Sequence, residues 1–164
     1  MLIREVTDVI ERFAPLAWQE SYDNAGLIVG RPDDEVHRAL LAVDVTDEVM
    51  AEAEREGCDM VITHHPIVFH ALKRFNSADQ VQRCVERAIR GGIALYACHT
   101  NLDSAPGGMS WRLAEMLGVQ KSTVQQLVRA GEFGPTVNVA RKHLVTEDGL
   151  AGFIARRTGP AHSG

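Results

Sequence analysis

The sequence predicts an α/β domain with a mostly parallel sheet and helices on both faces. Between residues 39 and 117, short apolar stretches alternate with amphipathic stretches of helical spacing. Strands that alternate with helices pair in parallel through right-handed crossovers. The chain also has 164 residues, 45% hydrophobic and 24% charged, which suits a globular domain with its own core.

The first half of the chain is expected to supply a helix, three strands and one crossover helix. Apolar positions over 2–13 recur with helical spacing, and Pro15 ends the run. Three apolar stretches flanked by turn residues or glycine predict strands. These strands cover 26–30, 39–45 and 60–63. Between the second and third strands, Thr46 or Asp47 caps a helix that Gly57 closes.

The second half continues the alternation and then loses it. A loop is expected over 66–76, and residues 77–80 have the pattern of a capping box that opens a helix ended by Gly91 and Gly92. A strand over 93–97 and a helix from 109 or 110 to 117 follow. Later residues are less regular, with a strand expected over 125–128 and a helix over 150–157. The expected organisation is a domain over 1–119 and an irregular segment over 120–164.

Composition and charge exclude several classes of protein. No apolar run approaches the roughly 18 residues of a membrane span, and the N-terminus lacks the apolar core of a signal peptide. Three cysteines without a Cys-x-x-Cys pair indicate a reducing compartment, so a cytoplasmic protein is expected. The net charge of -5 gives no electrostatic reason to expect binding to nucleic acid or to a membrane.

Histidines gather in one part of the chain. Four of the seven are His64, His65, His70 and His99. Ligands of an open parallel sheet bind beyond the carboxyl ends of its strands. His64 and His65 follow the third predicted strand, His99 follows the fourth, and Asp103 comes four residues later. We therefore expect these two segments to meet at one edge of the sheet.

Imidazole and carboxylate ligands without thiolate suit zinc, iron, manganese or nickel. Side chains alternate on extended backbone, so His64 and His65 are expected to point to opposite sides and to serve two ions, with Asp103 bridging. Two-metal sites of this kind activate water. The alternative is a simple turn whose imidazoles bond backbone carbonyls. His99 and Asp103 on the neighbouring strand favour the metal site, while Asp44 is expected to cap the helix after it or to support the site.

Three segments resemble those of a known family. Residues 22–30 are Tyr-Asp-Asn-Ala-Gly-Leu-Ile-Val-Gly, and residues 59–69 are Asp-Met-Val-Ile-Thr-His-His-Pro-Ile-Val-Phe. Residues 96–103 are Tyr-Ala-Cys-His-Thr-Asn-Leu-Asp, followed by two glycines at 107 and 108. In this order and spacing, within residues 1–119, they resemble the Nif-three-like dinuclear metal-binding family, whose members are called GTP cyclohydrolase I type 2 homologues. Tyr22 stands where that family usually has Trp.

The resemblance implies metal ligation by His64, His65 and Asp103, with His99 in the same site as an auxiliary ligand or general acid/base. It also implies two divalent ions per subunit, a cytoplasmic homo-oligomer in the form of a toroidal hexamer, and a metal-dependent hydrolase. The family name implies a nucleotide as the small-molecule substrate, with hydrolytic ring opening of its guanine. A metal-carrying or regulatory module without turnover is the alternative.

Members of the resembled family are longer, and a His and a Glu near their end complete the two-metal site. Here His143 and Glu147 have the spacing of that pair. The alternative is that residues 150–158 match a helix from the middle of the family chain, which would make His143 and Glu147 surface residues. We expect the second arrangement, with a shortened C-terminal part.

Overall fold

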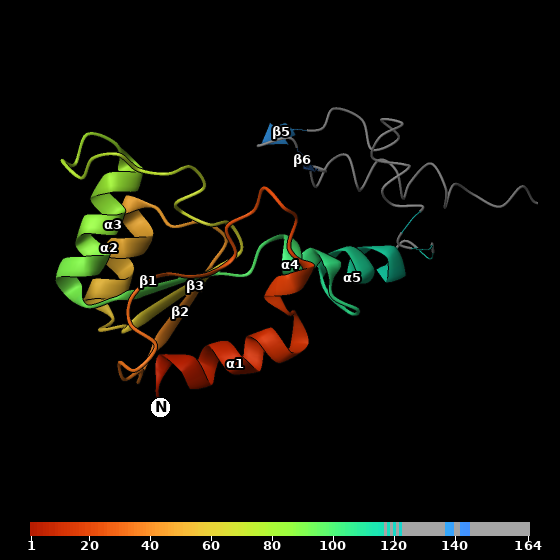
Figure 1. The fold of residues 1–164 in the computed structure, drawn as a ribbon, viewed down its shortest axis with the longest axis horizontal. Coiled ribbons are helices and arrows are strands. Elements are labelled where there is room, and N and C mark those ends of the chain that lie inside the picture. Colours follow the sequence, from red (N-terminus) through yellow and green to blue (C-terminus); the bar gives the residue numbers. More distant parts are fainter. Residues whose placement is uncertain (117, 119, 121, 123–136, 140–141, 145–164) are drawn as a thin grey trace, which may run out of the picture. The chain divides into compact units, whose positions relative to one another are not determined.

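The computed structural model describes residues 1–116, 118, 120, 122, 137–139 and 142–144. The chain divides into two compact units, Met1–Gly108 and Met109–Gly164. The first contains a four-stranded sheet (Figure 1). The second contains helix α5 (Met109–Met116) and an antiparallel pair, β5 (Val137–Val139) and β6 (Lys142–Leu144). The predicted domain boundary at residue 119 stays a prediction, and the strand and helix expected over 125–128 and 150–157 lie outside the described residues.

The sheet of the first unit is mixed. Its strands are β1 (Gly26–Val29), β2 (Ala39–Ala42), β3 (Met60–Thr63) and β4 (Ala94–Ala97). They lie in the order β1-β4-β3-β2. β2, β3 and β4 run parallel, whereas β1 pairs antiparallel with β4. The expectation of a mostly parallel sheet is therefore wrong at β1. The connection 30–38 contains no helix, so the chain does not make the crossover that parallel strands need.

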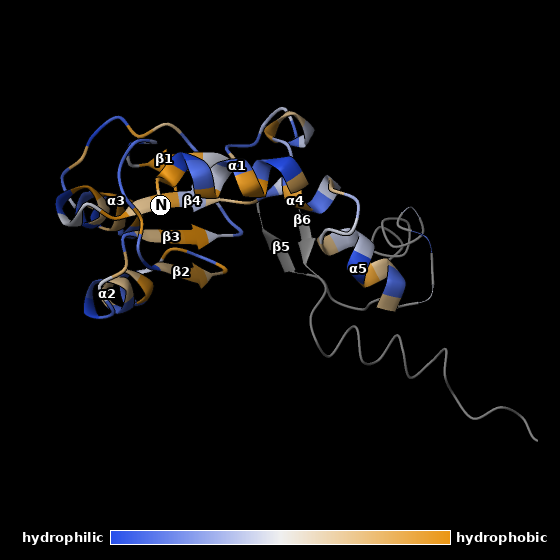
Figure 2. Cartoon of the chain, turned by 90° about the horizontal axis from the view of Figure 1, so that it is seen from below, coloured by the Kyte–Doolittle hydropathy of each residue, from blue (hydrophilic) through white to orange (hydrophobic). Residues whose placement is uncertain are grey.

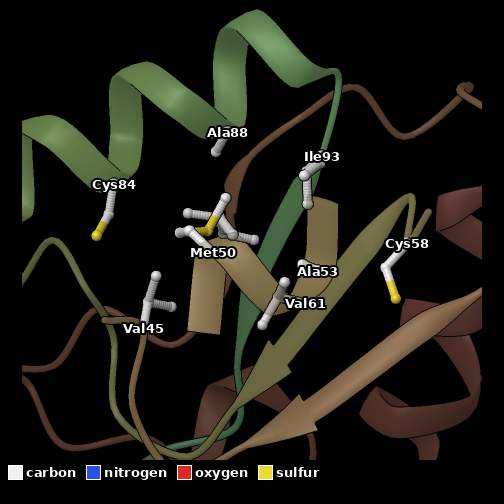
Figure 3. Packing of buried hydrophobic residues seen from close by; sticks show 9 residues of the cluster. Val45, Met50, Ala53, Cys58, Val61, Cys84, Ala88 and Ile93 are labelled. Atoms are coloured by element: carbon white, nitrogen blue, oxygen red, sulfur yellow. The ribbon is translucent and has the colours of Figure 1, made fainter. Parts of the chain in front are cut away.

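Two clusters of apolar side chains form the core. One joins α2 (Asp47–Arg55) and α3 (Gln80–Gly91) to the sheet, with Met50 of α2 lying beside Val61 of β3 (Figure 3). The other joins α1 (Ile3–Phe13) to Met60 and Tyr96. Because side chains alternate along a strand, Met60 and Val61 contribute to different clusters. The core therefore fixes β3 and β4 from several helices at once.

Side-chain caps set where the crossover helices begin. Thr46 Oγ1 accepts the Val49 N–H at 3.2 Å and caps α2, so of the two predicted caps, Thr46 and Asp47, it is Thr46 that fills the position. The capping box expected from Ser77 is wrong, because the cap of α3 is Asp79, which accepts the Gln82 N–H at 2.8 Å. An aspartate directly before the first helical residue can itself accept this N–H, so the helix needs no cap from Ser77.

Two short helices complete the first unit. They are the 3-10 helix η1 (Leu16–Trp18) and α4 (Thr100–Ser104). The predicted helix over 2–13 is found as Ile3–Phe13, and the strand expected over 39–45 ends at Ala42. Among the described residues, no helix has the length and apolar character needed to cross a membrane.

Candidate metal centre

Two histidine-bearing segments follow neighbouring parallel strands. β3 ends at Thr63 and is followed by His64 and His65, and β4 ends at Ala97, two residues before His99. Thr63 pairs directly with Ala97 in the sheet. The two segments therefore leave the sheet at the same edge, and the expected convergence of the histidines is found.

The three imidazoles form a close group. One ligand nitrogen from each of His64, His65 and His99 lies within 4.8 Å of the others. The ring centroids are 4.8 Å apart for His64 and His65, 5.4 Å for His64 and His99, and 5.6 Å for His65 and His99. The expectation that His64 and His65 point to opposite sides is wrong. The backbone bends after Thr63, whose Oγ1 donates to the His65 carbonyl at 2.9 Å, so strand alternation ends there.

Each imidazole has an oxygen at its Nδ1. The carbonyl oxygen of Cys98 lies 2.8 Å from His64 Nδ1, and Asp44 Oδ1 lies 2.7 Å from His65 Nδ1. Asp23 Oδ1 lies 2.5 Å from His99 Nδ1. Carbonyl and carboxylate oxygens only accept, so Nδ1 carries the proton and the lone pair of each neutral ring is on Nε2. Oxygen partners of this kind orient metal-binding histidines in proteins.

Asp23 is the site residue for which sequence reasoning proposed no role. Its side chain is fully buried and also accepts from the Thr100 N–H at 3.0 Å and from Thr100 Oγ1. Burial raises the pKa of Asp23, but the hydrogen bonds from Thr100 and His99 together outweigh it and leave the pKa below its usual value. The residue lies in the segment 22–30 that carried the family resemblance, which is the signal that could have found it.

The acidic residues at this edge lie close to the histidines. Asp103 Oδ1 is 3.8 Å from His64 Nε2. Oxygen and nitrogen ligands of one ion, each about 2.1 Å from it, lie no more than about 4.2 Å apart, so this pair can share an ion. The helix-capping role considered for Asp44 is wrong, because Thr46 caps α2 and Asp44 contacts His65 instead.

The other histidines considered from the sequence include His70 and His143. His70 lies in the loop after β3 and packs edge-on against Phe69, with ring centroids 5.2 Å apart. His143 falls in β6, where the structure describes the backbone, and Glu147 lies outside the described residues. The expectation that these two residues lie at the surface and do not complete the site therefore stays a prediction.

The donor set fits a divalent cation. It offers three imidazoles and one carboxylate without thiolate, which suits zinc, iron, manganese or nickel. The side chains of His64, His65 and Asp103 are 22%, 26% and 29% exposed, whereas that of His99 is 5% exposed. Among the described residues, the arrangement can therefore hold a cation on oriented ligands of which three remain partly exposed.

The chain is similar to the proteins of one known family. The family model described as Duf34/NIF3 (NGG1p interacting factor 3) matches residues 1–156. A Clostridium perfringens protein named GTP cyclohydrolase 1 type 2 homolog is 36% identical over 124 residues, 76% of this chain and 47% of that protein. A Staphylococcus aureus protein of the same name is 34% identical over 157 residues, 92% of this chain and 43% of that protein. The chain thus spans less than half of each relative.

Solved structures show the same fold. Staphylococcus aureus protein SA1388 has a TM-score of 0.67 at 36% identity, covering 72% of this chain and 34% of that one. Reduced HcgD from Methanocaldococcus jannaschii has a TM-score of 0.68 at 33% identity, covering 73% of this chain and 48% of that one. A Bacillus cereus protein related to NIF3 covers 87% of this chain and 45% of that one, with a TM-score of 0.68 at 27% identity.

Proposed function

The chain belongs to the Duf34/NIF3 family, and on that premise we propose that it binds two divalent metal ions through His64, His65 and Asp103. The observation that carries the proposal is the shared orientation of the imidazoles. Each Nδ1 meets an acceptor oxygen, so the lone pairs on Nε2 are available to one small region at the edge of the sheet.

The spacing of the ligand atoms supports two ions rather than one. Nitrogen ligands of a single tetrahedral ion, each about 2.0–2.1 Å from it, lie about 3.4 Å apart. The ligand nitrogens here spread over distances of up to 4.8 Å, which is more than the about 4.2 Å that two ligands of one ion can span. Two ions would not need all these groups to draw together around one centre, and Asp103 would serve as a ligand beside His64 and His65.

The function proposed for this site is metal-dependent hydrolysis. A divalent ion held by imidazole and carboxylate supplies activation of water for hydrolysis. The buried Asp23 carboxylate keeps the proton of His99 on Nδ1, so Nε2 can accept a proton from a reacting group and return it. His99 is therefore proposed as the general acid/base, or as an auxiliary ligand.

The substrate and setting are proposed from the relatives. Their printed name, GTP cyclohydrolase 1 type 2 homolog, supports a nucleotide such as GTP as the substrate class. A cytoplasmic homo-oligomer, in the form of a toroidal hexamer, is proposed from the family resemblance. A metal-carrying module without turnover is the outcome if hydrolysis fails the test below.

Metal binding is tested by titrating the purified protein with Mn²⁺ or Zn²⁺ and measuring bound metal by elemental analysis after desalting. We expect His64→Ala and Asp103→Ala each to lose at least half of the bound metal. His37→Ala is the matched control, because His37 is 73% exposed and lies before β2. Equal metal content in all of these proteins would contradict the proposal.

Turnover is tested on the same preparations. GTP is incubated with the metal-loaded protein and its products are separated by chromatography. We expect a metal-dependent product, and we expect His99→Gln to form it at least tenfold more slowly when both proteins are compared at full metal loading. Full metal loading without product would leave the metal site in place and favour the module without turnover.

A further inference from the structure

Among the residues that the structure describes, the strand β2 forms an open edge of the sheet. Within that part of the chain β2 pairs with β3 alone, and Figure 2 shows it as the outermost strand on its side of the sheet. Residues 39–43 are all apolar, and Leu41 and Val43 are 74% and 62% exposed. Leu40 packs against the α2–α3 cluster, so Leu41 and Val43 point to the other face of the sheet.

In the described part of the chain, this edge lacks the usual protection against pairing with another strand. Edge strands are commonly protected by lysine, proline, a bulge or a covering segment. Residues 39–43 contain no lysine or proline, and β2 keeps a regular register with β3 over its whole length. The row of backbone groups on its outer side is therefore suited to pairing with another strand.

The charges that flank the edge identify a fitting partner. Arg38 precedes residues 39–43 and Asp44 follows them. In an antiparallel pairing of two copies centred on Leu41, Arg38 of each copy lies opposite Asp44 of the other, and Ala39 lies opposite Val43. Opposite charges placed directly across two strands stabilise their pairing. A second copy of this chain supplies both charges at the matching spacing.

We propose that a second copy of this chain pairs with β2 in antiparallel fashion across a two-fold axis at Leu41. Asp44 holds His65 at 2.7 Å. The second copy's Arg38 would contact this same carboxylate, since a guanidinium has five N–H donors and Arg38 uses Nη1 for the Glu56 carbonyl. The partner copy thereby fixes the group that orients a candidate metal ligand. This inference goes beyond the proposed function, because it identifies the edge of β2 as a contact surface and gives the register in which two copies pair.

Cross-linking tests the pairing directly. A cysteine at a two-fold axis lies beside its own copy, at a Cα separation that a disulfide can span. The native cysteines are all buried. We expect Leu41→Cys to form a covalent dimer under mild oxidation at least ten times faster than Val9→Cys, a control at a position 56% exposed on α1. Equal rates, or no dimer, would overturn the proposal.

A charge swap tests the register. In the Leu41→Cys background, Arg38→Asp is expected to slow cross-linking at least fivefold, because it places like charges opposite each other. Adding Asp44→Arg is expected to restore the rate, since it re-creates an opposite-charge pair. Failure of the second change to restore the rate would overturn the register. Metal content is measured in parallel on the Leu41→Cys protein, so that loss of the pairing and loss of the metal site are distinguishable.

Discussion

Replacing Asp23 by Asn tests how the site orients His99. The buried carboxylate faces His99 Nδ1 at 2.5 Å and also accepts from two donors of Thr100. An amide keeps one acceptor oxygen and places an NH₂ group where the other oxygen was. If that NH₂ group faces His99, the imidazole proton must move to Nε2, because two N–H donors cannot bond each other. Nε2 then has no lone pair for a metal ion or for a proton.

The expected loss of metal affinity follows from the role of the Asp23–His99 contact in orienting the imidazole. Loss of a partner that orients a metal-binding histidine lowers metal affinity by about 10–100-fold. This is about 1.4–2.7 kcal/mol of binding free energy. The free energy of unfolding is expected to fall by about 2 kcal/mol as well, because hydrogen bonds to a buried charged acceptor become weaker or are lost.

Metal affinity is measured by titration against a competing chelator, and the His99 tautomer by the ¹⁵N chemical shifts of its ring in the metal-free protein. Thr100→Val is the matched control, because it removes one donor to Asp23 while the carboxylate and its contact with His99 remain. We expect this control to lose stability but to keep its metal affinity. Wild-type affinity in Asp23→Asn, with the proton still on Nδ1, would contradict a role of Asp23 in orienting His99.

Three further predictions concern stability and reactivity. Met50 is fully buried, so Met50→Ala should lower the free energy of unfolding by about 2–5 kcal/mol in urea, whereas Val9→Ala at an exposed position should cost under about 1 kcal/mol. Two backbone N–H groups before β2 hold the pKa of Asp59 below its usual value. The stabilisation by the Asp59 carboxylate is present above about pH 4 and is lost as the pH falls through the lower pKa of the folded state. Asp59→Asn should therefore lower the free energy of unfolding by about 1 kcal/mol at pH 7, and this difference from the wild type should disappear in acid. A difference that persists at pH 2 contradicts this. Burial raises the pKa of Cys84 and Cys98 to about 11, so a disulfide reagent at pH 8 should modify neither within minutes until the protein is denatured; rapid labelling of the native protein would contradict it.

The meeting of the histidines was predictable because it depends on strand direction alone. His64 and His99 follow strands joined by a helix, which fixes those strands as parallel and brings their carboxyl ends to one edge. The direction of β1 was not predictable from its own residues. A short apolar stretch between glycines does not specify its partner, and β1 pairs with β4, which lies far away in the sequence.

The directions in which the side chains of the site point were harder to predict from the sequence than which residues form it. The bend after Thr63 depends on a hydrogen bond from its side chain to the His65 carbonyl, which strand periodicity does not contain. Asp23 reaches His99 across 76 positions in the sequence, a contact that only the tertiary fold creates. Similarly, Asp44 was compatible with a capping role until Thr46 was found to fill it.

Anomalous diffraction from crystals grown with zinc tests the central claim most directly, because it locates each ion without reference to activity. We expect two anomalous peaks at the edge of the sheet, each within about 2.0–2.3 Å of a ligand atom of His64, His65 or Asp103. Full zinc loading with peaks elsewhere and none beside these residues would contradict this expectation.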